Sequence, residues 1–221
     1  MKKLLLIALT LTLGALSLQA QTIPNQRWQM RLRGVTVMPN ESANINTIGG
    51  DVDINTKFIP ELDFTYFFTK NIAAELILGT TKHKVNTTGS NLTAIGGSPS
   101  SNVDLGSVWL LPPTLTAQYH FLPDGAIKPY VGAGINYTIF YSVNAGQTVK
   151  NVKYDNAFGF ATQLGIDFKL SEKYFVNLDA KYILLKTDVN VDASNLAPNL
   201  SIPAKVDINP FLLGFGVGMK F

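Results

Sequence analysis

Apolar and polar residues alternate at every second position over most of the chain beyond residue 26. In the stretch 174–184 the even positions are apolar, whereas the odd positions include Asn177, Asp179 and Lys181. A period of two describes a β-strand whose two faces meet different surroundings. The alternation predicts eight strands, at residues 27–38, 57–68, 72–83, 107–121, 128–143, 154–169, 174–189 and 206–221.

The connections between these strands alternate between short and long. Short turns are expected at residues 69–71, 122–127 and 170–173. Longer segments, rich in Asn, Gly, Ser and Thr, are expected as loops at residues 39–56, 84–106, 144–153 and 190–205. Short turns at one end and long polar loops at the other are typical of outer-membrane barrels. We therefore predict an all-β fold: an eight-stranded antiparallel, up-and-down transmembrane β-barrel with short periplasmic turns and long extracellular loops.

A soluble barrel of the lipocalin type also alternates, but it places its apolar face inward and its charge outside. Here one face of the strands carries large aromatic residues to the strand ends, and the opposite face is rich in Gly, Ala, Asn and Asp. Small residues suit the narrow interior of an eight-stranded barrel, so the aromatic face is expected to meet lipid. An interfacial girdle is expected near the short turns, from Trp28, Tyr66, Tyr119, Tyr130 and Tyr174.

The first twenty residues have the order of a secretory signal peptide. Lys2 and Lys3 precede an apolar run at residues 4–13, and Ala20 precedes the polar Gln21. The run is too short to cross about 30 Å of hydrocarbon as an anchor. We predict a signal peptide at residues 1–20 that is removed, and a single barrel domain at residues 21–221 in the outer membrane of a Gram-negative bacterium.

The amino-acid composition argues against several other classes of function. Charged residues make up 15% of the chain, and without Lys2 and Lys3 there are 16 basic against 15 acidic residues, which gives no reason to expect a nucleic-acid partner. The absence of cysteine excludes disulfides, Cys-ligated zinc, iron–sulfur clusters and a thiol nucleophile. The two histidines, His83 and His120, offer no third ligand for zinc and no triad with a serine and an acid. We expect no metal, no cofactor and no enzymatic activity.

Three segments carry a resemblance to a known family. Val108–Phe121 contains Leu-Pro-Pro-Thr, Lys128–Tyr137 contains Pro-Tyr-Val-Gly-Ala-Gly, and Asp207–Phe221 alternates apolar residues with glycine. With residues 28–34 and 160–181, they resemble the OmpW family of Gram-negative outer-membrane proteins over essentially all of residues 27–221. The resemblance implies an eight-stranded barrel with a hydrophobic interior, proposed to pass small apolar molecules.

The alternating C-terminus also resembles the terminal signal that the outer-membrane insertion machinery reads. Its members are Phe215, Val217, Met219 and Phe221. We therefore expect the lipid bilayer and the insertion machinery as partners, and the sequence leaves the oligomeric state open.

Strand parity predicts an interior with two parts. Toward the short turns the inward positions are charged and polar, and they are expected to form a polar plug: Arg31, Arg33, Glu61, Asp63, Glu75, His120, Asp167, Asp179 and Lys181. Toward the long loops the inward positions are apolar, and they are expected to form a pocket: Val35, Val37, Ile59, Ile77, Leu110, Phe140, Ile183, Leu185 and Leu212. Mixed signs suit a buried plug because unpaired buried charges are costly. The apolar residues could also pack against one another or against folded loops.

Two functions follow from this arrangement. The first is a passive conduit that binds small hydrophobic molecules in the apolar lumen and releases them sideways into the bilayer, beside Pro112, Pro113 or Pro210, which lack the N–H for a ladder hydrogen bond. The alternative is a structural or surface-interaction barrel, an adhesin or receptor, acting through its loops. Residues 84–106 are rich in Ser, Thr, Asn and Gly, which is a composition for display rather than for a lid over the lumen.

Overall fold

The structure, a computed structural model, describes residues 26–221, so the signal peptide predicted at residues 1–20 lies outside the described residues. Strands make up most of the described chain. Their bounds are β1 (Trp28–Met38), β2 (Ser42–Ile45), β3 (Asp51–Ile54), β4 (Lys57–Phe67), β5 (Ile72–Gly79), β6 (Thr81–Ser90), β7 (Ser101–Leu111), β8 (Thr114–His120), β9 (Ile127–Ala145), β10 (Asn151–Tyr154), β11 (Ala157–Lys169), β12 (Tyr174–Asp192), β13 (Ser201–Asp207) and β14 (Phe211–Lys220). A short 3₁₀ helix, η1 (Thr93–Ile95), lies between β6 and β7.

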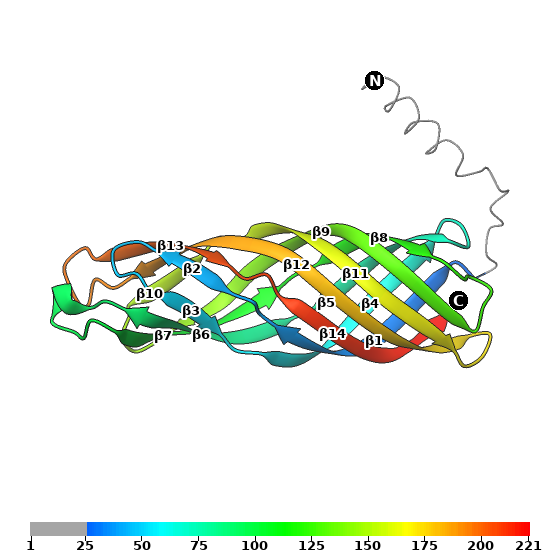
Figure 1. Ribbon diagram of the computed structural model, residues 1–221, viewed down its shortest axis with the longest axis horizontal. Helices are drawn as coiled ribbons and strands as arrows, with labels where there is room; N and C mark the ends of the chain where they lie inside the picture. The colour runs from blue at the N-terminus through cyan, green and yellow to red at the C-terminus, as the bar shows by residue number, and fades with distance from the viewer. Residues whose placement is uncertain (1–25) are drawn as a thin grey trace, which may run out of the picture.

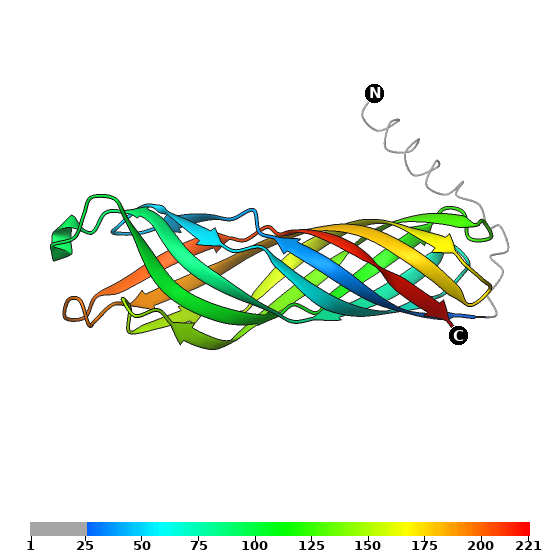
Figure 2. The ribbon, with the colours of Figure 1, turned by 90° about the horizontal axis from the view of Figure 1, so that it is seen from below.

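Eight strands form a closed antiparallel barrel at the end of the molecule where the C-terminus lies (Figures 1 and 2). Neighbours pair in the order β1, β4, β5, β8, β9, β11, β12 and β14, and β14 pairs with β1 to close the ring. We name this part the lower barrel. It confirms the predicted eight-stranded antiparallel fold.

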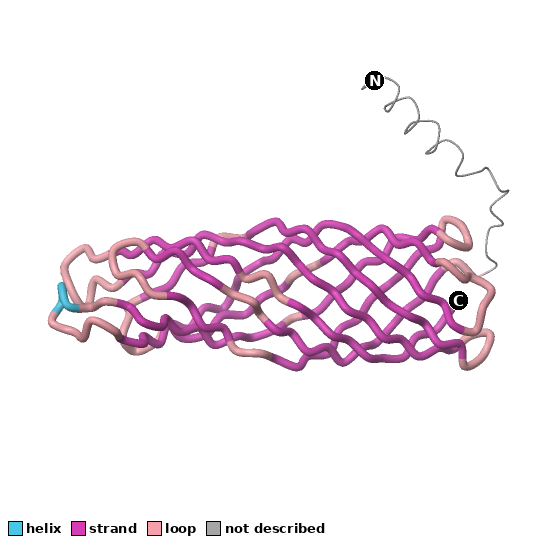
Figure 3. The backbone as a smooth tube through the Cα atoms, in the orientation of Figure 1, coloured by secondary structure: helices cyan, strands magenta, loops and turns pink. Residues whose placement is uncertain are grey.

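The strands continue beyond the lower barrel into a second part, which we name the upper barrel. It contains β2, β3, β6, β7, β10 and β13, together with the far ends of β9 and β12, which are unbroken through both parts. Figure 3 shows the breaks as short loop segments midway along the tube. The molecule is therefore much longer than a membrane-spanning barrel alone requires.

The predicted long loops are only partly right, because much of them is strand. In the predicted loop 84–106, β6 runs to Ser90 and β7 begins at Ser101, so only residues 91–100 connect the two strands. Val85 and Val103 point inward and are buried, and the alternation of burial continues through both strands. Threonine and valine fit a pleated, half-buried strand well, and this outweighs the loop-like Ser, Asn and Gly content.

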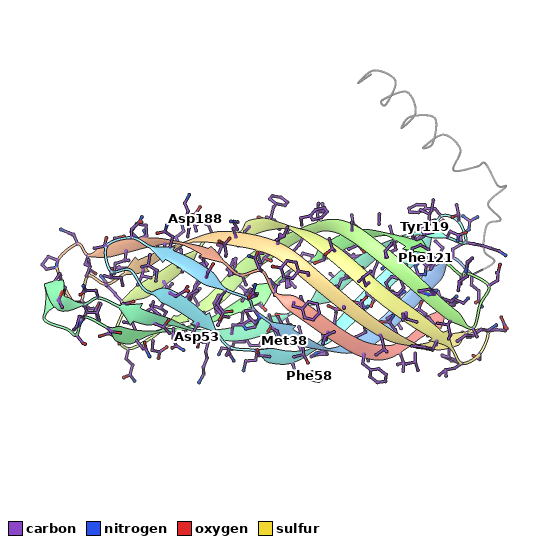
Figure 4. The ribbon with its side chains drawn as sticks, viewed as in Figure 1. Met38, Asp53, Phe58, Tyr119, Phe121 and Asp188 are labelled. Atoms are coloured by element: carbon purple, nitrogen blue, oxygen red, sulfur yellow. The ribbon has the colours of Figure 1, made fainter. Side chains whose placement is uncertain are left out.

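The outward surface changes character along the barrel axis. The lower barrel exposes large apolar side chains, among them Leu32, Leu76, Leu115, Ile135, Leu164, Leu178, Leu213 and Phe215. The upper barrel instead exposes charged ones, including Asp53, Lys82, Lys84, Lys153, Lys186 and Asp188. Figure 4 shows Tyr119 and Phe121 outside the short-turn end, whereas Asp53 and Asp188 lie on the upper barrel. An outward apolar band flanked by aromatic residues is the surface that meets a bilayer, so the lower barrel is the membrane-spanning part.

Within residues 26–221, no helix is both long enough and apolar enough to cross a membrane.

Candidate functional site

A network of buried charged side chains fills the lower barrel, and Arg31 on β1 lies at its centre. Its Nη1 donates to Asp63 at 3.0 Å, to Glu75 at 2.6 Å and to the hydroxyl of Thr65 at 2.9 Å. Its Nη2 lies 3.4 Å from a carboxylate oxygen of Asp167. Buried charges are tolerated only when opposite charges and hydrogen bonds surround them, as they do here.

A second layer of ion pairs lies directly above and shares carboxylates with the first. Arg33 contacts Glu61 through Nε at 3.1 Å, Asp63 through Nη2 at 2.7 Å and Asp179 through Nη1 at 3.3 Å. Lys181 Nζ lies 2.6 Å from Glu61 and 3.2 Å from Asp179. The two layers join strands from opposite sides of the barrel across its axis.

Amide side chains complete the network. Gln118 Nε2 donates to Glu75 at 2.7 Å, and Gln163 Nε2 donates to Glu75 and to Asp179, each at 2.8 Å. His120 lies at the lower edge, where its Nε2 is 3.0 Å from Gln118 Oε1. All nine residues predicted for the plug are buried inside the lower barrel, and only His120 takes part without an ion pair.

Tyr130 was predicted for the outer girdle, and this prediction is wrong. Its side chain is only 1% exposed, and its hydroxyl donates to Asp179 at 2.7 Å. The ring lies against Gly165 on the neighbouring strand, where a Cβ atom would come within 2.1 Å of the ring. The alternation along β9 indicates the inward position, because Tyr130 lies on the same face of the strand as the small residues Gly132 and Gly134.

The other four predicted girdle residues lie on the outer surface. Trp28, Tyr119 and Tyr174 are about half exposed, and Tyr66 is partly exposed with its ring 4.9 Å from that of Trp28. The prediction missed Phe175, whose buried ring lies under Arg31, with 5.6 Å between the guanidinium carbon and the ring centroid.

An apolar cavity of about 190 Å³ lies above the plug, inside the upper barrel and the top of the lower barrel. Eight of the nine residues predicted for the apolar lumen line it: Val37, Ile59, Ile77, Leu110, Phe140, Ile183, Leu185 and Leu212. The ninth, Val35, is fully buried but does not line the cavity.

Side chains from the connecting segments also line the cavity. Leu92 and Ile95, around η1, line it from the connection between β6 and β7, and Leu196 and Leu200 line it from the connection between β12 and β13. The expectation that residues 84–106 are poorly suited to form a lid stays a prediction. Two isolated apolar residues in a polar segment carry no periodic signal, so only the folded chain shows where they pack.

The lower end of the cavity is polar, and its hydroxyl groups have hydrogen-bond partners within the barrel wall. Glu61 and Lys181 reach it from the plug, beside the hydroxyls of Thr81, Thr114 and Thr138. Those hydroxyls lie 3.1 Å from His83 Nε2, 3.0 Å from the Pro112 carbonyl oxygen and 2.8 Å from Asn136 Oδ1, respectively. The apolar cavity thus ends where the ion pairs of the plug begin.

The wall of the cavity is interrupted at one of the predicted proline sites. The ladder between β5 and β8 ends at the pair Ile77–Thr114, and the ladder between β6 and β7 starts at Thr81–Leu110. Pro112 and Pro113 lie between them, and Pro112 lines the cavity.

The other proline site is more firmly bridged. The backbone N–H of Ile183 donates to the Pro210 carbonyl at 3.1 Å, and that of Ile208 donates to Leu185 at 2.9 Å. Strand β12 therefore stays attached to the chain on both sides of Pro210.

The C-terminal residues lie on the lipid-facing side of β14. Phe215, Val217 and Phe221 are each at least half exposed, and Met219 is partly exposed. This is the face that the predicted insertion signal requires. Within residues 26–221, no group of three or more His, Cys, Asp or Glu side chains is placed to hold a metal ion.

Comparison with known proteins agrees with this architecture. The model of the OmpW family matches residues 26–221. Outer-membrane protein y4mB of Sinorhizobium fredii is 46% identical over 195 residues, which cover 88% of this chain and 80% of that protein. Outer membrane protein W of Vibrio cholerae is 32% identical over 197 residues, which cover 84% of each chain.

Solved structures show the same fold. The crystal structure of OprG from Pseudomonas aeruginosa has a TM-score of 0.79 and 25% identity, with 91% of this chain and 98% of OprG covered. The solution structure of outer membrane protein W from Escherichia coli has a TM-score of 0.58 and 27% identity, with 89% and 98% covered. This chain is therefore a member of the OmpW family and an outer-membrane protein of Gram-negative bacteria.

Proposed function

We propose that this barrel is a passive conduit for small hydrophobic molecules. A solute enters the upper barrel from outside the cell and occupies the apolar cavity. It then leaves sideways into the bilayer through the wall beside Pro112 and Pro113.

The observation that carries this proposal is the apolar cavity of about 190 Å³ directly above a plug of buried ion pairs. An apolar solute gains about 25 cal/mol for each Å² of apolar surface that leaves water. The same solute gains nothing from the plug, because entering it would break buried ion pairs and leave charges uncompensated. The favourable path therefore stops above the plug and turns toward the lipid.

The interrupted ladder supports the position of the exit. Leu111, at the end of β7, is exposed on the outer surface, and Trp109 stacks with Tyr141 nearby at 6.2 Å between ring centroids. Aromatic residues of this kind mark the boundary of the apolar band. An opening beside Pro112 would thus connect the cavity with the outer leaflet. Pro210 is a weaker candidate because backbone hydrogen bonds hold the chain around it toward both neighbouring strands, from Ile183 to Pro210 and from Asn40 to Ile208. At the other site a backbone hydrogen bond, from Tyr137 to Pro113, holds the side toward β9, and the Thr80 hydroxyl holds the opposite side.

The alternative function, adhesion or reception through the loops, has less support. Leu92 of the connection between β6 and β7 packs against the buried apolar residues of the upper barrel, and Ile95 also lines the cavity. Part of this connection therefore contributes to the interior rather than to a surface for a partner.

Placing a charge in the cavity tests the proposal. Leu110→Asp and Ile183→Asp each put a carboxylate into the apolar wall, so uptake of a fluorescent apolar probe by expressing cells should fall to the level of cells without the barrel. Asn190→Asp is the matched control, because Asn190 is exposed on β12 and the change adds the same charge outside the cavity. Folded barrel in the outer membrane is measured in parallel by heat-dependent gel mobility. Wild-type uptake by both inward variants, at equal amounts of folded protein, would refute the conduit.

A further inference from the structure

A second cavity, of about 440 Å³, opens at the short-turn end of the barrel, below the plug. Five lysines line it against three carboxylates: Lys70, Lys128, Lys169, Lys173 and Lys220 against Asp124, Asp167 and Glu172. We name it the periplasmic vestibule. Because the plug closes it from above, it cannot belong to the path of an apolar solute.

Each carboxylate of the vestibule is already engaged by a cation. Lys70 pairs with Asp124 at 3.0 Å, and Asp167 lies 3.4 Å from Arg31 in the plug. Lys169 pairs with Glu172 in the turn before β12, and this hydrogen bond lowers the pKa of the Glu172 carboxyl.

Two half-buried lysines are left over. Among the described residues, neither Lys128 on β9 nor Lys220 on β14 forms a salt bridge within 4 Å, and both line this cavity. The Lys128 ammonium donates to the Pro123 carbonyl, and the Lys220 ammonium lies 6.0 Å from the centroid of the Phe175 ring. The nearby carboxylate is Asp167, which lies opposite Lys128 in the ladder between β9 and β11, attracts Lys220 and is shared with Arg31. A further anion would therefore balance the two ammonium groups better than this one shared carboxylate does.

Gln29 adds a neutral donor to the same wall. It is paired with Lys220 in the ladder between β1 and β14, and its side chain is only 2% exposed. Its Oε1 accepts a hydrogen bond from Arg31 at 3.2 Å, so the amide NH₂ is the end available to the vestibule it lines. Lys128, Lys220 and Gln29 therefore offer donors to one small space.

We infer that the periplasmic vestibule binds a phosphate group between Lys128, Lys220 and the Gln29 amide. A planar carboxylate is best matched by the fork of an arginine, and none of the described residues that line this cavity is an arginine. Lysine acts as a point charge and suits a compact anion with several oxygens, such as phosphate.

The position of the vestibule allows two sources of this phosphate. One source is a soluble phosphate ester in the periplasm. The other is a phospholipid headgroup, because Leu122, Leu170 and Tyr174 expose apolar surface around this mouth at the membrane boundary. Both sources present the same chemistry to the two lysines.

Lysine side-chain NMR on the refolded barrel tests the inference. Sodium phosphate and glycerol 3-phosphate are titrated into the micellar protein, with sodium chloride at matched ionic strength as the reference. In a second arm, phosphatidylglycerol is added to zwitterionic bicelles. Saturable shifts of the Lys128 and Lys220 signals are expected, while those of Lys82 and Lys84, exposed on the upper barrel, stay unchanged. Saturation by the soluble phosphates identifies a periplasmic ligand, and saturation by phosphatidylglycerol alone identifies a lipid headgroup.

Paired variants give a second readout. The double variant Lys128→Gln/Lys220→Gln should bind phosphate at least about tenfold more weakly, whereas Lys82→Gln/Lys84→Gln should bind as the wild type does. Unmoved Lys128 and Lys220 signals in the wild type, or equal shifts with chloride, would overturn the inference even if the double variant failed to fold. Apolar-probe uptake is unaffected by either result, because the vestibule lies on the far side of the plug.

Discussion

At the residue scale, the lower interior is built by pairing aromatic rings with glycines. A Cβ atom at Gly165 would lie 2.1 Å from the Tyr130 ring, and one at Gly218 would lie 2.3 Å from the Phe175 ring. Each ring occupies space that is free only because the neighbouring residue is a glycine and has no side chain. Tyr130 in turn holds Asp179 of the plug by a hydrogen bond of 2.7 Å. A glycine on one strand thus determines where a plug carboxylate lies on another.

The substitution Gly165→Ala should therefore destabilise the barrel. Overpacking a close-packed interior typically lowers the free energy of unfolding by about 1–3 kcal/mol. Here the added methyl group would displace the Tyr130 ring. Urea unfolding of the barrel in lipid vesicles measures the change. Gly79→Ala is the control, because the nearest atom to a Cβ there is 3.7 Å away. Equal stabilities of the two variants would contradict this account of the packing.

At the scale of the element, the break between β7 and β8 is caused by proline rather than by a change of register. The pairs Ile77–Thr114 and Thr81–Leu110 belong to one continuous register, so the missing pairs are those of Pro113, Pro112 and the preceding Leu111. Proline has no N–H to donate. The wall is held at its upper side by the Thr80 hydroxyl, which donates to the Leu110 carbonyl at 3.0 Å. We name this gap between the β5–β8 and β6–β7 ladders the seam. It can open without breaking the hydrogen bonds of a regular ladder.

Tethering this seam should stop lateral release. In the double variant Thr80→Cys/Leu111→Cys, a disulfide would join the two sides in a chain that has no other cysteine. Transfer of an apolar probe into proteoliposomes should be lost after oxidation and restored by reductant. Ala117→Cys/Ala133→Cys tethers a regular pair of the β8–β9 ladder and should leave transfer unchanged. Undiminished transfer through an oxidised seam would exclude the exit beside Pro112.

At the scale of the whole molecule, the barrel is a closed tube with a different chemistry at each level. Its upper part encloses an apolar cavity, its middle is sealed by ion pairs, and its lower end opens into a cationic vestibule. Eight strands leave an interior just wide enough for side chains, unlike the aqueous lumen of larger porins. A hydrated ion could pass only by breaking the pairs of Arg31 and Arg33.

Wild-type barrels in planar bilayers should therefore show little or no steady conductance. The double variant Arg31→Ala/Glu75→Ala removes the central pair, whose atoms are 2.6 Å apart, and should open a measurable, unselective current. Lys153→Ala/Asp155→Ala, which removes an exposed pair of the upper barrel, should stay silent. Large, stable currents through the wild type would mean that the plug does not seal.

The strands and the direction of most of their side chains could be predicted from the amino-acid sequence, because alternation with a period of two is a local property of each strand. It therefore placed Arg31 and Glu75 inside, Leu110 on the inner wall and Phe215 on the lipid side. The family resemblance and the outer-membrane location rest on the same local patterns.

Which inward residues contact one another depends on the folded barrel. The partners of Arg31 come from β4, β5 and β11, up to 136 positions away, and no local pattern encodes that meeting. The alternation along single strands likewise could not place Tyr130 against Gly165, bring Leu92 to the apolar cavity, or bring Lys128 and Lys220 to one cavity wall. These features depend on ring closure, which brings strands from opposite ends of the chain into contact, and on the neighbours that each side chain then finds across the axis.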